Sequence, residues 1–197
     1  MKKIELLSPA GDIEKLKIAY LYGADSCYIG GQSYSLRANA NNFSLDEIEE
    51  ATKFAHKLNK KIYVTVNIVF HNEDLEGVEK YLEKLNDIKV DGVIICDIFL
   101  LPIIREKFKN LKIIFSTQGS TTNTLSVEYL KNEGVSTVVV AREVGKKDIK
   151  EIISKTGASI EVFLHGAMCS NISGRCVLSN YFTNRDANRG GCCQVCR

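Results

Sequence analysis

The sequence predicts a parallel α/β fold, and three observations support this prediction. Seven short β-branched runs alternate with six helical patterns along the chain. The runs are almost continuously apolar, as expected for parallel strands that are covered on both faces. Their repeat has the length of a βα unit, so we expect sequential βα units rather than hairpins.

Strands are expected at residues 4–9, 26–31, 62–67, 92–97, 113–118, 137–142 and 160–166. Helices are expected at residues 12–23, 44–58, 75–85, 100–108, 124–132 and 146–157.

Caps and apolar spacing identify the helices. The first begins at Asp12. The second opens with a capping box, in which Ser44 is the N-cap and Glu47 follows three residues later. Pro102 is acceptable in the first turn of the fourth helix, and Gly157 ends the sixth. The third helix shows apolar residues at 3-4-3 spacing: Leu75, Val78, Leu82 and Leu85.

A doubly wound open sheet and a (β/α)₈ barrel both fit this pattern. The chain has no GxGxxG after its first strand and no GxxxxGK[ST], which removes the usual nucleotide-binding reason for an open sheet. We therefore expect an incomplete TIM-barrel-like domain of about seven βα units over residues 1–166. Residues 167–197 are expected to form a cysteine-rich loop of the same domain.

The predicted strand ends carry polar residues, and barrel enzymes place their chemistry at these ends. His165 and Arg142 each end an otherwise apolar strand, and Asn67 and Gln118 end two others. We take these four as candidate catalytic residues. Helix capping is the alternative explanation for Asn67 and for Asp97.

Five of the seven cysteines lie after Gly166, with the spacing C-x6-C-x15-C-C-x2-C. Thiolates in a glycine-rich loop suit a metal or an iron–sulfur centre. The spacing favours a cluster, and zinc is the alternative, because only Cys193 and Cys196 form a zinc-like knuckle. Cys27 and Cys96 lie in apolar runs and are expected to be small buried hydrophobes.

Composition limits the other classes of function. A net charge of +2 predicts no general affinity for nucleic acid or membrane. The chain opens without a signal peptide, and no apolar run approaches the ~20 residues of a membrane span. We expect a cytoplasmic protein with reduced thiols, so an odd number of unevenly placed cysteines argues against a disulfide framework.

The cysteine-rich loop is nevertheless basic. We expect Arg175, Arg185 and Arg189 to bind RNA phosphate or another anion. The alternatives are a solvated loop or pairing with Asp186. A His165–Cys169 reactive pair is also conceivable, but no GxSxG or HExxH supports hydrolysis.

The residues around these cysteines resemble the peptidase U32 signature, E-x-F-x2-G-[SA]-hydrophobic-C-x4-G-x-C-x-hydrophobic-S. The tail NRGGCCQVCR, the opening LLSPAGD and the segment GADSCYIGG are similar to other blocks of that family. The specified signature positions are occupied by Glu161, Phe163, Gly166, Ala167, Met168, Cys169, Gly174, Cys176, Leu178 and Ser179.

The resemblance implies two kinds of activity. Members were first described as collagenase-like proteases, whereas better understood members are RNA or quinone hydroxylation factors with a [4Fe–4S] cluster, including prephenate-dependent tRNA uridine hydroxylation proteins. The resemblance also implies that Cys169, Cys176 and Cys192 are cluster ligands. The fourth ligand would be Cys196 or would come from a missing C-terminal region or a partner U32 chain.

We therefore expect an iron–sulfur enzyme of tRNA or rRNA nucleoside hydroxylation, with prephenate a possible cosubstrate. A collagenase-like peptidase is the first alternative. A zinc-stapled RNA-binding module without catalysis is the second.

Overall fold

A computed structural model gives the structure of the chain and describes residues 4–36, 42–166, 168–173 and 175–196. The strands are β1 (Leu7–Pro9), β2 (Ser26–Gly30), β3 (Lys61–Val66), β4 (Gly92–Ile95), β5 (Lys112–Phe115), β6 (Thr137–Val139) and β7 (Ile160–Glu161). The helices are α1 (Ile13–Leu21), α2 (Leu45–Lys57), α3 (Val78–Ile88), α4 (Leu100–Lys107), α5 (Thr124–Asn132), α6 (Lys146–Thr156) and α7 (Leu178–Thr183). Three 3₁₀ turns are η1 (Asn72–Asp74), η2 (Thr117–Gly119) and η3 (Ala187–Arg189).

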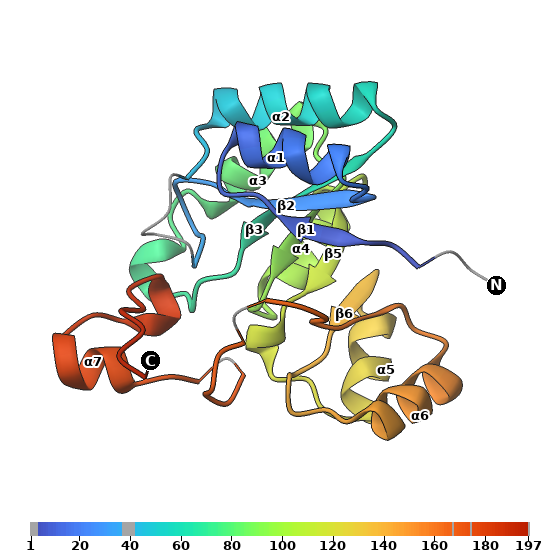
Figure 1. Cartoon of the computed structure of the whole chain (residues 1–197), viewed down its shortest axis with the longest axis vertical. Coiled ribbons are helices and arrows are strands. Elements are labelled where there is room, and N and C mark those ends of the chain that lie inside the picture. Colours follow the sequence, from blue (N-terminus) through green and yellow to red (C-terminus); the bar gives the residue numbers. More distant parts are fainter. Residues whose placement is uncertain (1–3, 37–41, 167, 174, 197) are drawn as a thin grey trace.

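The seven strands form one parallel sheet in the order β1-β2-β3-β4-β5-β6-β7. A doubly wound sheet would change direction at a switch point, whereas sequential order is that of a barrel. The sheet curls into a half-barrel with β1 and β7 as its edges, and Figure 1 shows α1 and α2 covering its outer side. The predicted TIM-barrel-like class is confirmed.

The core has two parts because alternate strand residues face opposite sides of the sheet. The larger part packs between the sheet and the helices, and its fully buried members include Leu16, Ile48 and Leu85. A smaller cluster lies on the other face, formed by Tyr63, Ile94, Ile114 and Val139.

Local signals account for the helix boundaries. The capping box of α2 is present, with Ser44 N donating to Glu47 Oε2 at 2.7 Å and Glu47 N donating to Ser44 Oγ at 3.3 Å. Asp12 caps α1 and accepts from Lys15 N at 2.8 Å. None of the helices within the described residues is long and apolar enough to cross a membrane.

Three expectations about the elements need correction. The predicted strand at residues 160–166 is paired only over β7, and Phe163 and Leu164 are 44% and 88% exposed. Leu75 is not in α3, because Gly77 adopts φ +89° and ends the preceding turn. The cysteine-rich segment, residues 167–197, contains α7 and η3 and is not simply a loop.

Candidate functional site

A pocket of about 220 Å³ lies where the carboxyl ends of the strands meet the cysteine-rich segment. Leu36 reaches it from the connection after β2, Gln118 from η2 after β5, and Arg142 from the connection after β6. The rest of its wall comes from the cysteine-rich segment. These residues are Cys169, Asn171, Ile172, Arg175, Cys176, Leu178, Ser179, Ala187, Asn188, Cys192, Gln194, Val195 and Cys196.

Four cysteines line this pocket together: Cys169, Cys176, Cys192 and Cys196. They are the four residues expected to hold a cofactor. Cys176 is half-buried and the other three are exposed.

The neighbouring Cys193 is not part of this wall. Its thiol lies 3.3 Å from Thr183 Oγ1 and 3.5 Å from Arg185 Nη1. The hydrogen bond with Thr183, followed by the contact with Arg185, holds the pKa of this thiol below its usual value. The structure therefore directs two consecutive cysteine side chains to different surroundings.

The pocket wall has the chemistry that an iron–sulfur cluster requires. Among the described residues that line it, the soft metal ligands are four thiols, and there is no histidine, aspartate or glutamate. Soft thiolates select iron–sulfur clusters or zinc over hard cations, and a [4Fe–4S] cluster takes four of them. Arg142 and Arg175 would offset the negative charge of a thiolate-ligated cluster. No three His, Cys, Asp or Glu side chains within the described ranges are already gathered around a single ion position.

Asn188 fixes the position of Cys176. Its Nδ2 donates to the Cys176 carbonyl at 2.9 Å, and its Oδ1 accepts from Cys176 N at 3.2 Å. The carbonyl of Asn188 in turn accepts from Val69 N at 3.0 Å, after β3. One side chain thus holds a pocket cysteine by two hydrogen bonds while its backbone contacts the barrel.

Ser173 provides a second attachment of the cysteine-rich segment to the barrel. Its side chain is completely buried, and its Oγ accepts from Arg142 N at 3.1 Å and lies 3.3 Å from Thr117 Oγ1. Ser173 N donates to Glu143 Oε1 at 2.7 Å. This backbone hydrogen bond is the main reason why the pKa of Glu143 lies below its usual value.

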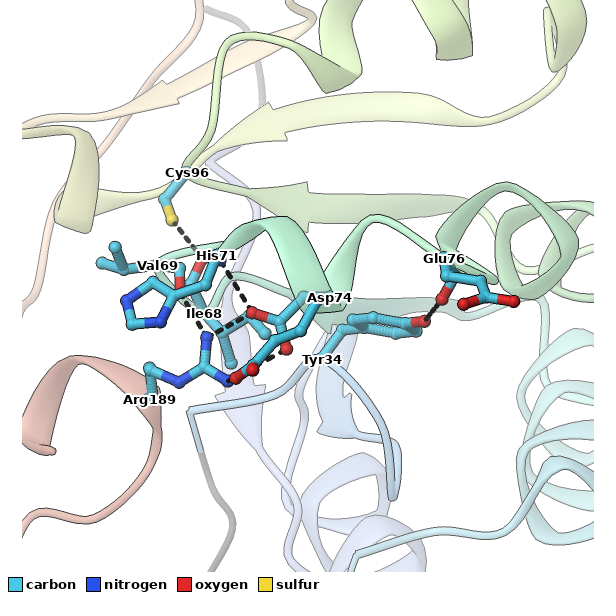
Figure 2. Close-up of polar contacts among 9 residues, drawn as sticks. Tyr34, Ile68, Val69, His71, Asp74, Glu76, Cys96 and Arg189 are labelled. Carbon is cyan, nitrogen blue, oxygen red and sulfur yellow. Dashed lines mark hydrogen bonds and ion pairs between the residues drawn. The ribbon is translucent and has the colours of Figure 1, made fainter. Parts of the chain in front are cut away.

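Arg189 makes the third attachment, shown in Figure 2. Its Nη2 donates to Asp74 Oδ1 at 3.0 Å, its Nη1 contacts Asp74 Oδ2, and Nη1 also donates to the Val69 carbonyl at 3.2 Å. The guanidinium hydrogen bond holds the pKa of Asp74 below its usual value. The side chain of Arg189 thus faces carboxylates of the chain itself, and its expected anion-binding role stays a prediction.

We expect the Arg189–Asp74 pair to contribute to stability. Asp74 is 15% exposed and Arg189 23%, so a bidentate pair here is poorly screened. A double-mutant cycle of Arg189→Ala and Asp74→Ala, measured by denaturant unfolding, should give a coupling free energy of about 1–2 kcal/mol. The pKa of Asp74 is lower in the folded protein than in the unfolded chain. The coupling free energy is therefore fully present at pH values above the pKa of the unfolded chain, and it is lost as the pH falls through the pKa of the folded protein.

The matched control is the pair Lys107–Glu79, which has a 2.6 Å contact but is about half exposed at both ends. Its cycle should give less than about 0.5 kcal/mol. Equal coupling in the two cycles would contradict a structural role for Arg189.

The remaining predicted residues divide by location. Gln118 and Arg142 line the pocket. Asn67 is 8% exposed and its Oδ1 accepts from Leu36 N at 3.3 Å, so it supports the pocket wall from behind. His165 is exposed and is not a lining residue, and within the described chain no hydrogen bond joins it to Cys169. Their catalytic roles stay predictions.

Arg175 and Arg185 lie where an anion could reach them, and their expected anion-binding roles stay predictions. Arg175 lines the pocket, and Arg185 is exposed beside α7. Cys27 and Cys96, in contrast, are not among the lining residues of the pocket, and burial raises the pKa of both thiols. Two signature residues, Ala167 and Gly174, and the terminal Arg197 lie outside the described residues.

Sequence reasoning missed Asn188, Ser173 and Asp74. Asn188 lies in the NRGG segment that carries the family resemblance, so that segment was its available signal. Ser173 and Asp74 carry no local signal, because their partners are about 30 and 115 residues away in sequence.

Comparison with known proteins gives a family and a set of relatives. The model of peptidase family U32 matches residues 11–197. The tRNA hydroxylation protein P1 of Bacillus subtilis is 52% identical over 196 residues, which cover 100% of this chain and 46% of that protein. The tRNA hydroxylation protein P of Escherichia coli is 38% identical and is covered to 44%.

An Escherichia coli 23S rRNA 5-hydroxycytidine synthase is also 38% identical, over 99% of this chain and 29% of its own length. The chain thus spans about half or less of the length of these relatives. A solved U32 peptidase structure superposes with a TM-score of 0.69 at 11% identity, covering 81% of this chain and 68% of that one. This likeness concerns the fold.

Proposed function

Since the chain belongs to peptidase family U32, we propose that it takes part in the hydroxylation of a tRNA or rRNA nucleoside in the cytoplasm. Relatives named for tRNA hydroxylation match the whole chain, at up to 52% identity, and a relative named for rRNA hydroxylation matches 99% of it. The proposal includes a [4Fe–4S] cluster held by Cys169, Cys176, Cys192 and Cys196.

The observation that carries the proposal is the pocket in which these four cysteines meet Gln118. It lies at the carboxyl ends of parallel strands, where barrel enzymes place their reacting groups. The thiols come from the cysteine-rich segment, and Gln118 and Arg142 come from connections of the barrel. A cluster on the thiols would therefore share the pocket with side chains that can orient a substrate.

The reaction replaces a C–H bond of the base by C–OH. This change is a two-electron oxidation and requires an oxygen donor and an electron acceptor. A [4Fe–4S] cluster, when held by the four cysteines, would supply electron transfer, and the oxygen donor and the final electron acceptor would be separate reactants. The chain's own contribution is to orient the base and a cosubstrate, for which Gln118 offers an amide and Arg142 and Arg175 offer guanidinium groups.

Prephenate as the cosubstrate is part of this proposal. It is a dicarboxylate, and guanidinium forks bind carboxylates by paired hydrogen bonds. Arg142 and Arg175 both line the pocket, so two guanidinium groups are available there for two carboxylates.

The test uses a Bacillus subtilis strain that lacks its tRNA hydroxylation proteins. We would express the chain alone, and also as a chimera in which it replaces the matched segment of protein P1. Hydroxylated nucleosides are then measured by mass spectrometry in digested tRNA and rRNA. We expect them to reappear with the chimera and to be absent with empty vector.

Two outcomes would contradict the proposal. One is a folded chimera that restores no hydroxylated nucleoside in either RNA. The other is a chain that purifies with zinc and binds tRNA without any modification, which is the behaviour of a zinc-stapled binding module.

A further inference from the structure

Two aromatic side chains are displayed on α7 without protein cover in the described structure. Tyr181 is 82% exposed and Phe182 65% exposed. Their ring centroids are 5.0 Å apart and the ring planes meet at 88°. Figure 1 shows α7 at the outer side of the C-terminal segment. Exposed aromatic pairs of this kind are typical of binding surfaces rather than of ordinary solvent-facing helices.

The helix that displays them is itself firmly held. Ser179 is 1% exposed, and its Oγ accepts from Cys193 N at 3.1 Å. The Thr183 hydroxyl donates to the Ser179 carbonyl at 2.7 Å. The rings are therefore exposed on a helix whose inner side is buried and hydrogen-bonded to the following chain.

The aromatic pair also lies next to the cysteine-lined pocket. Leu178 and Ser179 of the same helix belong to the pocket wall. One short helix thus contributes both to the pocket wall and to the exposed ring pair. A ligand that extends out of the pocket across α7 would meet Tyr181 and Phe182.

The charge around the rings favours a polyanion. Arg185 follows α7 and is exposed, and its guanidinium Nη1 donates to the weakly polar Cys193 thiol at 3.5 Å. Asp186, the one acidic residue after Gly166, uses Oδ1 to accept from Asn188 N at 2.8 Å. Aromatic faces beside an arginine are the recognition surface for unpaired bases of single-stranded nucleic acid.

We propose that Tyr181 and Phe182 form a stacking platform for unpaired RNA bases that flank the nucleoside held in the pocket. Arg185 contributes phosphate contact or a guanidinium plane to the same strand. This inference rests on the proposed function, and it assigns the binding of unpaired flanking bases to α7.

The test compares binding of two RNAs by fluorescence anisotropy. One is a hairpin with an unpaired loop, and the other is a fully paired duplex of the same length. The variant Tyr181→Ala/Phe182→Ala should bind the hairpin at least about tenfold more weakly, because loss of base–aromatic stacking has about this effect. Binding of this variant to the duplex should change little. The variant Tyr181→Trp/Phe182→Trp keeps two aromatic rings and should bind the hairpin as the wild type does.

Tyr22→Ala is the matched control, because Tyr22 is 83% exposed but lies at the end of α1. It should leave hairpin binding unchanged. Far-UV circular dichroism checks that each variant is folded, which we expect because the replaced side chains are exposed.

The outcomes separate this inference from the proposed function. If the wild-type chimera hydroxylates RNA but the alanine variant binds the hairpin normally, the platform is wrong and the function stands. Equal weakening on hairpin and duplex, or failure of tryptophan to restore binding, also overturns the platform. A wild-type chain that binds neither RNA also overturns the platform. The same holds if the alanine substitutions change self-association of the chain and leave RNA binding unchanged.

Discussion

Cys192→Ser is expected to abolish cluster assembly, whereas Cys193→Ser should leave it unchanged. Cys192 lines the pocket with three other cysteines, while the thiol of its neighbour contacts Thr183 and Arg185 instead. Replacement of residues that merely support a metal ligand weakens metal binding by about 10–100-fold, so loss of a ligand should have at least that effect. The two variants differ by one position in the chain, which makes them a matched pair.

The measurement is anaerobic reconstitution with iron and sulfide, followed by analysis of both elements and of the visible absorbance. Wild type and Cys193→Ser should reach the same iron content, and Cys192→Ser should lose most of it. Far-UV circular dichroism establishes that both variants are folded. If both lose iron equally, or if wild type takes up zinc and no iron, the proposed ligand set is contradicted.

Gly92→Ala is expected to destabilise the barrel by about 3 kcal/mol or more. Gly92 begins β4 and pairs with Lys112 of β5. A Cβ at this position would lie 2.4 Å from the Lys112 carbonyl oxygen and 2.9 Å from the Lys112 Cβ. The obstacle is backbone in the middle of the sheet, so relief requires movement of a paired strand and not of a flexible side chain.

Denaturant unfolding followed by far-UV circular dichroism gives the change in the free energy of unfolding. Gly11→Ala is the control, because the nearest atoms to its added Cβ are 3.9 Å away on the Lys15 side chain. Its effect should stay within about 1 kcal/mol. A similar change in the free energy of unfolding for both variants would contradict the expected clash beside Gly92.

The fold could be predicted from the sequence wherever the signal was local. The Ser44–Glu47 capping box and the bounds of α5 agree with the structure, because caps and apolar spacing act within a few residues. The β7 strand was predicted too long. The run after Glu161 is apolar, but apolarity does not distinguish a paired strand from exposed chain next to a sheet edge.

The candidate site could be predicted less completely. Family resemblance identified the cysteines that line the pocket, and strand ends identified Gln118 and Arg142. The pairing of Arg189 with Asp74 could not be predicted from the sequence. A basic residue in a glycine-rich segment has the same sequence signature whether it faces solvent or a carboxylate, and Asp74 is 115 residues away.

This long separation has a consequence for the order in which the molecule folds. Strand partners in the sheet are between 19 and 35 residues apart, so the half-barrel has a low contact order and its loops close at small entropic cost. Arg189 can reach Asp74 only after β3 and η1 are in place. During synthesis from the N-terminus, we therefore expect the strands of the half-barrel to pair before the cysteine-rich segment docks onto them.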